Sequence, residues 1–462
     1  MTDYFFCGIG GSGMLPLAML LRARGHVIAG SDRSFDQGRS AEKFAWLERQ
    51  GIRLFPQDGS GITDSYQVLI ASAAIESTVP EVARADELGC KRMSRAEALS
   101  GLFNAAPTSI GVAGTSGKST VTGMIGWIMA DAGRDPGIMN GAVMKNFVSD
   151  DTPFASARGG GGDVFVSEVD ESDGSIALYE PFVAVLLNVT LDHKSMDELR
   201  TLFGDYLEAA DMAVVNADDD EAFRLVGRAN GVVTFGIDNG CATIVAEPGE
   251  TIGHRQEATI IDRRDDSRHA LCLAMPGRHN LSNALAAIAA ASEAGVPIAE
   301  AVSALGRFEG LARRFDVVGE TASGIVVIDD FGHNPEKVAA TLRTLKAEPG
   351  RVIAFFQPHG YGPIAQMGRE LADVVAGELD DEDRFLLCDP VYFGGTTDKS
   401  IGSADLAAWI ERAGGHAVHL PGRDACADRI VEIAAPRDRI VVMGARDDTL
   451  SKFAADLLDR LA

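Results

Sequence analysis

The sequence predicts three α/β domains in series. Its 462 residues suggest about three domains at about 150 residues each. Short apolar strands alternate with helical segments in two separate blocks, which is typical of a parallel sheet with crossover helices. Between residues 240 and 275 the apolar residues instead alternate with period two among many turn residues, so we expect antiparallel hairpins there. The middle domain therefore combines a mostly parallel sheet with added antiparallel strands.

The first domain is expected to span residues 1–106. Strands are predicted at 4–8, 27–29 and 68–71, and helices at 12–24 and 80–88. The segment Ala105-Ala106-Pro107-Thr108 interrupts this alternation because proline cannot continue a helix or a central strand. We therefore place the first boundary there.

The second domain is expected to span residues 107–312 and the third 313–462. In the second we predict strands at 110–113, 164–168, 183–188 and 212–216, and helices at 118–132, 281–294 and 298–305. In the third we predict strands at 325–329, 352–356, 385–388 and 440–443, and helices at 335–345, 404–412 and 449–461.

Charge and composition exclude several classes of protein. With 42 basic and 67 acidic residues the formal charge is −25, which argues against a protein whose main partner is nucleic acid or an anionic membrane. A small anionic ligand stays compatible, since a local pocket suffices for it. No segment approaches the roughly 20 apolar residues of a membrane span, and the N-terminus lacks a basic leader. The six cysteines form no C-x-x-C pair. We expect reduced thiols and a cytoplasmic location.

The first glycine-rich loop contains Gly8, Gly10 and Gly13 in G-x-G-x-x-G spacing, between a predicted strand and a predicted helix. In this context the backbone can approach a phosphate closely. Asp32 ends the second strand, where a carboxylate can meet a sugar hydroxyl. Alone, the motif would suggest a nicotinamide cofactor, or a turn without a ligand.

A second loop, residues 114–120, also lies between a strand and a helix. Lys118 can reach the β- and γ-phosphates of a nucleotide, and the Ser119 hydroxyl can bind Mg²⁺. The loop is shorter than a full Walker A motif because Val112 stands where the first glycine would be. Two phosphate loops in consecutive domains predict two phosphorylated ligands, which disfavours a simple dehydrogenase.

Acidic residues follow two of the predicted strands in the middle domain. Glu168, Asp170 and Glu171 come after one strand, and the pair Asp192-His193 follows the next. The carboxyl ends of parallel strands form the ligand-binding edge of such sheets, and Mg²⁺ prefers oxygen ligands beside substrate phosphates. The sequence therefore predicts a magnesium site here; the alternative is a solvated acidic loop.

Taken together, these motifs resemble the Mur ligase family, and within it the subgroup that adds L-alanine to UDP-N-acetylmuramate. The resemblance runs through nearly the whole chain in order. The segments that carry the resemblance follow, with the family's own pattern in parentheses where one is given. They are residues 8–14 (G-I-G-G-x-G-M), 31–32, 71–75, 114–120 (G-T-x-G-K-[ST]-T), 168–173 (E-A-D-E-S-D), 277–283 (G-x-H-N-x-x-N), 308–315 (F-x-G-x-x-R-R-F), 329–335 (D-D-Y-G-H-H-P) and 356–359 (F-Q-P-H).

The resemblance implies a fold and a reaction. It implies an N-terminal Rossmann-like domain that holds a UDP-sugar, a central P-loop ATPase-like domain that binds ATP and Mg²⁺, and a C-terminal Rossmann-like domain that helps to hold an amino acid. ATP would phosphorylate the sugar carboxylate, and the amino group would displace phosphate from the acyl phosphate to form an amide. The implied partners are a nucleotide sugar of the UDP-N-acetylmuramate type and an amino acid, bound by a monomer or a homodimer.

The resemblance also implies roles for individual residues. Catalytic roles fall to Lys118, Glu168, His193, Arg314 and His333. ATP would be bound by Gly114, Thr115, Ser116, Gly117, Lys118, Ser119, Thr120, Asn280, Asn283, Arg314 and Asp330. The other substrates would be bound by Gly10, Gly11, Ser12, Gly13, Met14, Asp32, Ser72 and His359. Metal ligands would come from Ser119, Thr120, Glu168 and His193.

The chain departs from the subgroup near the phosphate and acceptor sites. Ser116 replaces a histidine, Asn334 replaces the second histidine of its motif, and Gly360 and Pro363 replace two arginines. Phe203 stands where many family members carry a carbamylated lysine, which the alanine-adding subgroup also lacks.

Three hypotheses follow. The chain is an alanine ligase, a paralogous ligase for another amino acid or a recycled muropeptide, or a catalytically inactive binding module of the same fold. The presence of Lys118, Glu168 and His193 disfavours the third.

Overall fold

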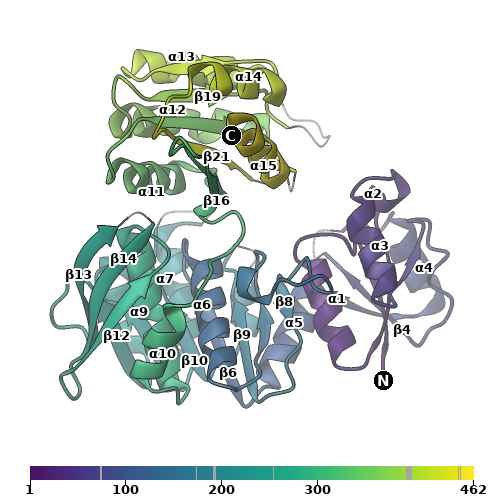
Figure 1. Cartoon of the computed structure of the whole chain (residues 1–462). Coiled ribbons are helices and arrows are strands. Elements are labelled where there is room, and N and C mark those ends of the chain that lie inside the picture. Colours follow the sequence, from purple (N-terminus) through teal and green to yellow (C-terminus); the bar gives the residue numbers. More distant parts are fainter. Residues whose placement is uncertain are drawn as a thin grey trace. The chain divides into compact units, whose positions relative to one another are not determined.

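The computed structural model describes residues 1–72, 75–172, 174–190, 194–252, 254–391, 398–445, 447 and 449–462. In this part of the chain, three β-sheets carry helices on their faces (Figure 1). The chain divides into two units: Met1–Ala274 with Asn280–Glu309, and Met275–His279 with Gly310–Ala462. The first unit holds two of the sheets and the second unit holds the third, so the predicted α/β class with three domains is confirmed. The exact domain boundaries stay a prediction.

The N-terminal sheet is parallel throughout, in the order β3-β2-β1-β4-β5. Its strands are β1 (Asp3–Cys7), β2 (Val27–Ser31), β3 (Arg53–Phe55), β4 (Gln67–Ala71) and β5 (Lys91–Ser94). Its helices are α1 (Met14–Ala23), α2 (Arg33–Asp36), α3 (Ala41–Arg49), α4 (Pro80–Leu88) and α5 (Arg95–Asn104). Phe6 packs with the core on the side of α1, α3 and α5, whereas Phe5 and Cys7 pack with α4. The alternation follows from the period of two in a strand.

The central sheet has ten strands in the described residues, in the order β15-β14-β13-β12-β11-β10-β6-β9-β7-β8. These are β6 (Thr108–Ala113), β7 (Gly137–Met139), β8 (Ala157–Arg158), β9 (Val164–Glu168), β10 (Val183–Leu186), β11 (Met212–Asn216), β12 (Val232–Gly236), β13 (Ile244–Ile252), β14 (Arg255–Asp262) and β15 (Ser267–Leu273). Strands β13, β14 and β15 are antiparallel, as the period-two pattern predicts. The middle of the sheet is parallel and buried on both faces.

Helices cover the central sheet. They are α6 (Lys118–Asp131), α7 (Met196–Glu208), α8 (Asp220–Arg224), α9 (Arg278–Glu293) and α10 (Ile298–Leu305), with short 3₁₀ turns η1 (Lys145–Phe147), η2 (Ser175–Leu178) and η3 (Val226–Arg228). Beneath β6, the Tyr206 ring of α7 comes so close to the sheet that a Cβ at Gly111 would lie 2.1 Å from its hydroxyl oxygen. Glycine at position 111 therefore makes room for Tyr206.

The first unit is tied together between its two sheets. The Trp46 indole of α3 donates a 2.9 Å hydrogen bond to the carbonyl oxygen of Asp151, and its ring packs edge-on against Phe154 at 5.4 Å. The Arg24 guanidinium lies over the ring of Phe165 at 5.2 Å. These contacts join the elements around the N-terminal sheet to those around the central sheet.

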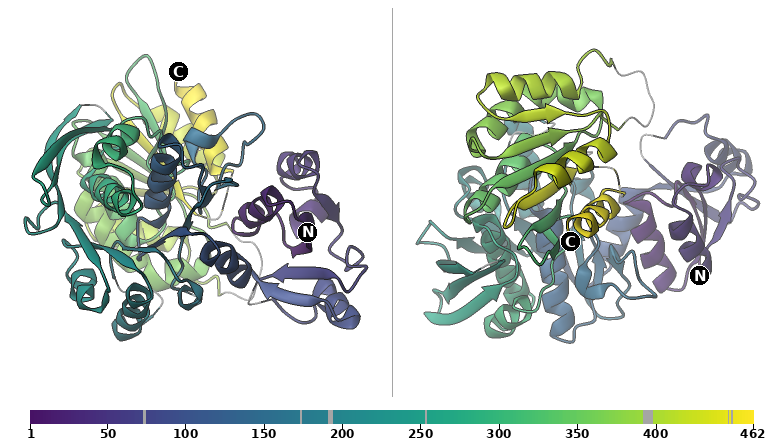
Figure 2. Two further views of the ribbon diagram at one scale, coloured as in Figure 1. Left: turned by 90° about the horizontal axis from the view of Figure 1, so that it is seen from below. Right: turned by 45° about the horizontal axis from the view of Figure 1, so that its top comes forward.

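The sheet of the second unit runs β16-β17-β21-β18-β19-β20, parallel except for β16. Its strands are β16 (Asp316–Glu320), β17 (Val326–Asp330), β18 (Val352–Gln357), β19 (Arg384–Leu387), β20 (Ala417–His419) and β21 (Arg439–Gly444). Its helices are α11 (Pro335–Lys346), α12 (Tyr361–Glu378), α13 (Ser403–Arg412), α14 (Arg423–Ile433) and α15 (Leu450–Leu461). Helices α11 to α13 pack on one face and α14 and α15 on the other, as the right-hand view of Figure 2 shows.

Helix α12 is the longest element that the sequence analysis missed. It begins at Tyr361, directly after Gly360, whose φ is +148°, and Pro363 lies in its first turn. The segment Gly360-Tyr361-Gly362-Pro363 is typical of a turn, but proline is tolerated in the first turn of a helix because that N–H has no helical partner. Among the described residues, no helix is long and apolar enough to cross a membrane.

Candidate active site

The second glycine-rich loop joins β6 to α6 and depends on its glycines. Gly114 and Gly117 have φ values of +132° and +90°, a backbone region that other residues rarely adopt. A Cβ at Gly117 would also lie 2.8 Å from the Asn283 side-chain oxygen. The loop therefore exposes backbone at the start of α6, the arrangement that phosphate binding requires.

Lys118 is held at the centre of this loop. Its ammonium nitrogen lies 2.6 Å from the Gly114 carbonyl oxygen and 2.9 and 3.2 Å from the two carboxylate oxygens of Glu171. Glu171 is buried and belongs to the acidic segment after β9. The lysine and the acidic segment, 53 residues apart in sequence, are thus brought together.

Asn188 fixes the loop from the next strand, and the sequence analysis gave it no role. Its amide oxygen accepts a 2.8 Å hydrogen bond from the Ser116 N–H, and its amide nitrogen donates one of 3.0 Å to the Ser116 carbonyl. Thr115 bonds the same segment, since its hydroxyl accepts from the Thr190 N–H at 2.9 Å. The sequence shows only that Asn188 follows a predicted strand; that this strand, β10, pairs with β6 is a property of the fold.

Glu168 ends β9 in register with Val112 of β6, two residues before the loop begins. Its Oε1 accepts a short hydrogen bond from the Gly141 N–H. Asp170 lies near two cations. Burial opposes its ionisation, but hydrogen bonds from Ser172 and the charges of Lys118 and Arg95 outweigh that and hold the pKa of Asp170 below its usual value.

The hydroxyl-bearing residues at the start of α6 are buried. Ser119 is 8% exposed and Thr120 is 7% exposed, and the Ser119 carbonyl accepts a 2.9 Å hydrogen bond from the Asn140 amide. The predicted ligand His193 lies outside the described residues. Within the described ranges, no group of three or more His, Cys, Asp or Glu side chains is arranged as a ready-made metal site.

Helix α9 brings the two predicted adenine-binding asparagines to the same loop. Asn280 is almost fully buried, and its side-chain oxygen lies 3.5 Å from the amide nitrogen of Asn283. Asn283 lies beside Gly117, because a Cβ at Gly117 would lie 2.8 Å from the Asn283 side-chain oxygen. The loop, the acidic segment and these asparagines therefore surround one place in the first unit.

The first glycine-rich loop lies between β1 and α1. Asp32 accepts hydrogen bonds from the Gly10 N–H at 2.8 Å and from the Ser34 N–H at 2.7 Å, so it braces the loop and caps α2. Its carboxylate, predicted to meet a sugar hydroxyl, is thus already engaged and only 8% exposed. Gly11 and Ser12 are exposed, Met14 is buried, and Ser72 is exposed after β4. Ala73 and Ala74 of the same motif lie outside the described residues.

The remaining predicted residues gather in the second unit. Asp330 ends β17 and accepts hydrogen bonds from the N–H groups of Phe315 and Gly332 at 2.8 Å each and from the Thr341 hydroxyl at 3.0 Å. The Arg314 guanidinium lies over the Phe331 ring, 4.6 Å from its centre. Asp330 therefore organises the turn that carries its neighbours.

His333 and His359 lie together in this unit, with their rings edge-to-face and 5.2 Å apart. The His333 Nδ1 lies 2.8 Å from the Phe331 carbonyl oxygen, which can only accept, so Nδ1 carries the proton and Nε2 keeps its lone pair. Burial, with the charge of Lys337, lowers the pKa of His333 to about 3. His333 is therefore neutral at physiological pH.

Arg313, adjacent to the predicted Arg314, has a structural role instead. It lies 3.4 Å from Asp329 Oδ1 and donates hydrogen bonds to the carbonyl oxygens of Gly444 and Asp447 at 2.7 and 3.0 Å. Burial raises the pKa of Asp329 in spite of Arg313. Of the two consecutive arginines, Arg313 is thus held by the fold of the second unit.

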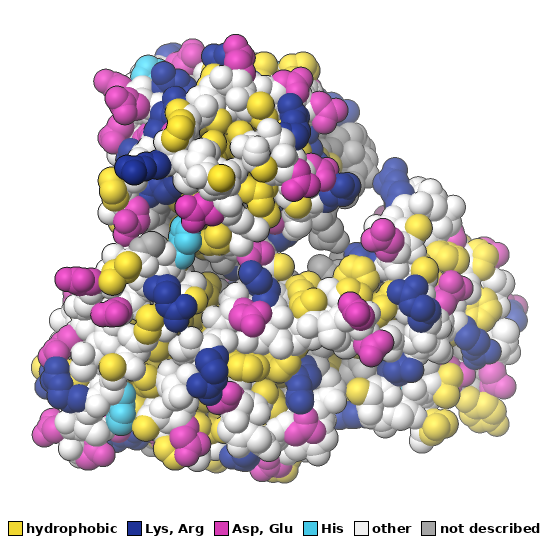
Figure 3. Space-filling model, in the orientation of Figure 1, with side chains coloured by type: hydrophobic (Ala, Val, Ile, Leu, Met, Phe, Trp, Pro, Cys, Tyr) yellow, Lys and Arg dark blue, Asp and Glu magenta, His cyan; other side chains and the backbone are white. Residues whose placement is uncertain are grey.

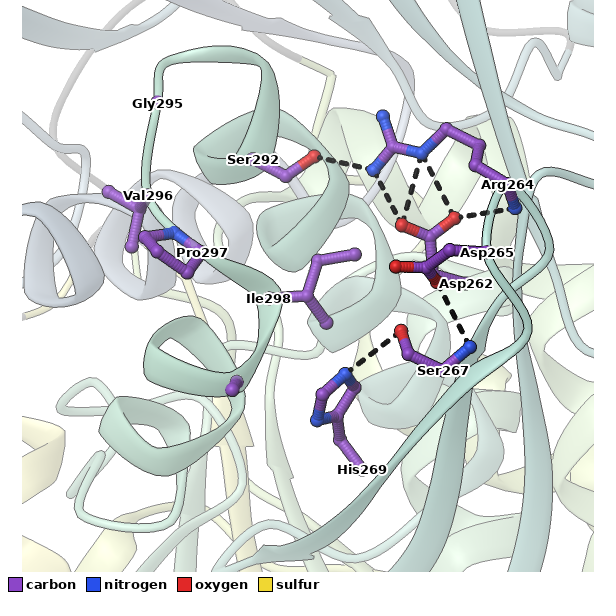
Figure 4. A pocket seen from close by; sticks show the side chains of 11 residues that line it. Asp262, Arg264, Asp265, Ser267, His269, Ser292, Gly295, Val296, Pro297 and Ile298 are labelled. Atoms are coloured by element: carbon purple, nitrogen blue, oxygen red, sulfur yellow. Dashed lines mark hydrogen bonds and ion pairs between the residues drawn. The ribbon is translucent and has the colours of Figure 1, made fainter.

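A surface groove of about 460 Å³ lies away from these residues, between the β14–β15 hairpin and the turn from α9 to α10 (Figure 4). Its Arg264 is bound by Asp262 and also reaches Glu293 at 2.8 Å. None of the phosphate-loop residues line it, so we do not assign the reaction to this groove. On the face in Figure 3, basic and acidic side chains are interspersed rather than gathered into a basic patch.

Three family models match the chain in order. "Mur ligase family, catalytic domain" matches residues 3–106, "Mur ligase middle domain" 112–291, and "Mur ligase, glutamate ligase domain" 313–446.

Curated relatives span the whole chain. The UDP-N-acetylmuramate–L-alanine ligase of Streptomyces avermitilis is 33% identical over 99% of this chain and 97% of the relative. That of Clavibacter michiganensis is 34% identical over 96% of this chain and 90% of the relative.

Among solved structures, the UDP-N-acetylmuramate–alanine ligase of Thermotoga maritima has a TM-score of 0.81 at 24% identity, covering 100% of this chain and 99% of that one. A murein peptide ligase of Psychrobacter arcticus has a TM-score of 0.71 at 24% identity, with the same coverage. At these identities the two structures establish the fold. With the family models and the curated relatives, they lead to one conclusion: the chain belongs to the Mur ligase family and is an ATP-dependent ligase.

Proposed function

We propose that this ligase joins L-alanine to the carboxylate of UDP-N-acetylmuramate in peptidoglycan precursor synthesis. The observation that carries the proposal is the arrangement of residues around the Lys118 loop. Glu171 forms an ion pair with Lys118, Glu168 lies on the strand next to the one that leads into the loop, and Asn283 lies beside Gly117. The curated relatives, similar over nearly their full length, carry the name of this activity.

The reaction would run in two steps. The sugar carboxylate attacks the γ-phosphorus of ATP and releases ADP, which leaves an acyl phosphate. The amino group of alanine then attacks the acyl carbon, the C–O bond to phosphate breaks, and the amine loses a proton. Amide and inorganic phosphate are the products.

The residues of the loop would stabilise charge in the first step. Lys118, already positioned by Gly114 and Glu171, would hold the phosphoryl group in transit, and the backbone N–H groups at the start of α6 would bind phosphate oxygens. Asn280 and Asn283 would orient the adenine. In the second unit we assign Arg314 to an ATP phosphate and Asp330 to the ribose. His359 and the neutral His333 are assigned to the acceptor side.

The residues present fit Mg²⁺. Ser119 and Thr120 offer hydroxyl oxygens and Glu168 a carboxylate of which only one oxygen is engaged by Gly141. Mg²⁺ favours such a set of few protein oxygens completed by substrate phosphates and water. Bound there, the ion would neutralise phosphate charge. We also propose His193 as a ligand, and a cytoplasmic location for the enzyme.

A second candidate keeps the chemistry and changes the acceptor. The likeness to murein peptide ligases motivates it: besides the Psychrobacter structure, one from Neisseria is 26% identical, with a TM-score of 0.57, covering 67% of this chain and 98% of that one. Gly360, with φ +148°, directly precedes α12, so a position where the subgroup has arginine carries no side chain here.

The test is phosphate release by the purified enzyme with MgATP and UDP-N-acetylmuramate, across a panel of amino acids and short peptides. Turnover restricted to L-alanine supports the proposal. Turnover with a peptide or another amino acid instead would establish the second candidate. Lys118→Ala serves as the control for contaminating ATPases, because it should abolish the signal with every acceptor.

A further inference from the structure

Arg95 packs against the first glycine-rich loop. It is the first residue of α5, which lies beside α1 (Figure 1). A Cβ at Gly13 would lie 3.0 Å from Arg95 Cδ, 3.3 Å from Nε and 3.6 Å from Cζ. The side chain therefore runs across the Cα of Gly13, and glycine at that position provides the space for it.

The guanidinium of Arg95 has donors to spare. The side chain is partly buried, yet among the described residues it forms no hydrogen bond and no ion pair. Two other arginines nearby in the sequence do form ion pairs: Arg92 pairs with Asp86 at 3.1 Å and Arg84 with Glu87 at 2.5 Å. In a chain with 67 acidic residues, a partly buried arginine that recruits none of them is suited to an external anion.

The charge of Arg95 also reaches the acidic segment beside the second loop. That charge acts on the Asp170 carboxylate, and so does the charge of Lys118. Asp170 follows β9 at the edge where the ATP loop begins. Both cations therefore act on one carboxylate, Lys118 from the second loop and Arg95 from beside the first.

An anion that binds Arg95 must accept hydrogen bonds from the guanidinium group, whose N–H donors form a planar fork, next to the backbone of the glycine-rich loop. Phosphate oxygens match this geometry, and the fork can hold two of them at once. A free carboxylate would fit the fork as well, and the test below distinguishes the two. Gly13 belongs to the glycine-rich loop whose backbone can approach a phosphate closely, and this position favours the phosphates of the nucleotide sugar.

We propose that Arg95 is a substrate-positioning residue that binds the diphosphate of the nucleotide sugar. The inference rests on the proposed function, since it takes the nucleotide sugar as the ligand of the first loop. Held there, the diphosphate fixes the distance from the first loop to the sugar carboxylate, so that this carboxylate is delivered to the Lys118 loop.

The test compares Arg95→Ala and Arg95→Lys with the wild type, using calorimetric titration of UDP and of uridine. Arg92→Ala is the matched control, an exposed arginine three residues away. Loss of a charged hydrogen bond of this kind corresponds to roughly 10- to 100-fold weaker binding. We expect UDP to bind Arg95→Ala about 10- to 100-fold more weakly, with uridine affinity unchanged. Arg95→Lys keeps the charge and the stem, so its loss should be smaller.

Steady-state kinetics give the second readout. KM for UDP-N-acetylmuramate should rise in Arg95→Ala by a similar factor, with the KM for ATP within 3-fold of the wild type. Equal losses for UDP and uridine would mean that Arg95 only supports the fold, which would overturn the inference. Unchanged UDP binding with a raised KM for the full sugar would overturn it in favour of the carboxylate. If wild-type enzyme binds no UDP, the proposed function fails instead.

Discussion

Lys118 and Glu171 form a buried ion pair in which the ammonium nitrogen lies 2.9 and 3.2 Å from the two carboxylate oxygens. The pair holds the lysine in the phosphate loop before a nucleotide arrives. The cation that we propose as catalytic is thus positioned in advance, which is the arrangement that makes electrostatic stabilisation effective.

The first prediction concerns this pair. Lys118→Met should lower kcat at least 10²- to 10³-fold, the usual cost of removing one charge-stabilising donor. Glu171→Gln should leave the lysine present but less well fixed, with kcat down roughly 10-fold and the KM for ATP little changed. Phosphate release at saturating substrates measures both. Glu180→Gln, an exposed acidic residue nearby in sequence, is the control; a loss there as large as in Glu171→Gln would contradict the assignment.

The second prediction concerns Asn188, whose side-chain amide forms two hydrogen bonds with the backbone of Ser116. Asn188→Ala removes both, at roughly 1 kcal/mol each, so we expect the KM for ATP to rise about 10-fold with a lowered melting temperature. Asn188→Asp keeps the acceptor and loses the donor. Its KM should fall between those of wild type and alanine variant, and an unaltered KM in both variants would show that the loop needs no such support.

His333 gives a pH dependence of stability. Its pKa is about 3 in the folded protein against about 6.5 unfolded, so the unfolded chain binds more protons between these values. Its contribution to stability is complete above pH 6.5 and declines as the pH falls toward 3. At pH 5 the loss is roughly 2 kcal/mol.

Urea titration of the wild type and of His333→Gln at pH 5 and pH 7.5 isolates this effect. The midpoint should drop further on acidification in the wild type than in the variant, since other groups titrate in both. Equal drops would mean that His333 is protonated without cost in the folded state.

The cysteines give a fourth prediction. Burial, with the nearby charge of Glu81, raises the pKa of Cys7 to about 11, so its thiol is protonated at neutral pH although it lies beside the first loop. Cys241 is exposed. Brief alkylation of the native enzyme followed by peptide mass spectrometry should label Cys241 well before Cys7. Loss of activity that tracks labelling of Cys7 would contradict this.

The sequence predicts the site where the chemistry is local. Glycines 114 and 117, Lys118 and the acidic segment after β9 could all be found because strand, turn and helix succeed one another there. It could not reveal that Asn188 holds the loop or that Glu171, rather than its acidic neighbours, pairs with Lys118. Those facts depend on which strands lie side by side, and sheet order is a tertiary property.

The fold shows the same division. The hairpins between 244 and 273 were predicted from their period of two, whereas the short edge strands β3, β5 and β20 were not, since three or four residues give too few positions for a pattern. Asp32 shows how far the sequence can predict a binding residue. An acidic residue after β2 suggests a sugar contact, but its carboxylate oxygens accept hydrogen bonds from the N–H groups of Gly10 and Ser34 instead.

The contact between Gly111 and Tyr206 has a consequence for how such an enzyme can change over generations. A side chain at position 111 would collide with the tyrosine hydroxyl 2.1 Å away, three residues ahead of the phosphate loop. Position 111 cannot vary on its own: alanine there becomes tolerable only after the residue at 206 has become smaller. Position 206 can shrink first while glycine stays at 111, so the order of the two changes is fixed, and a library that randomises only position 111 will return glycine.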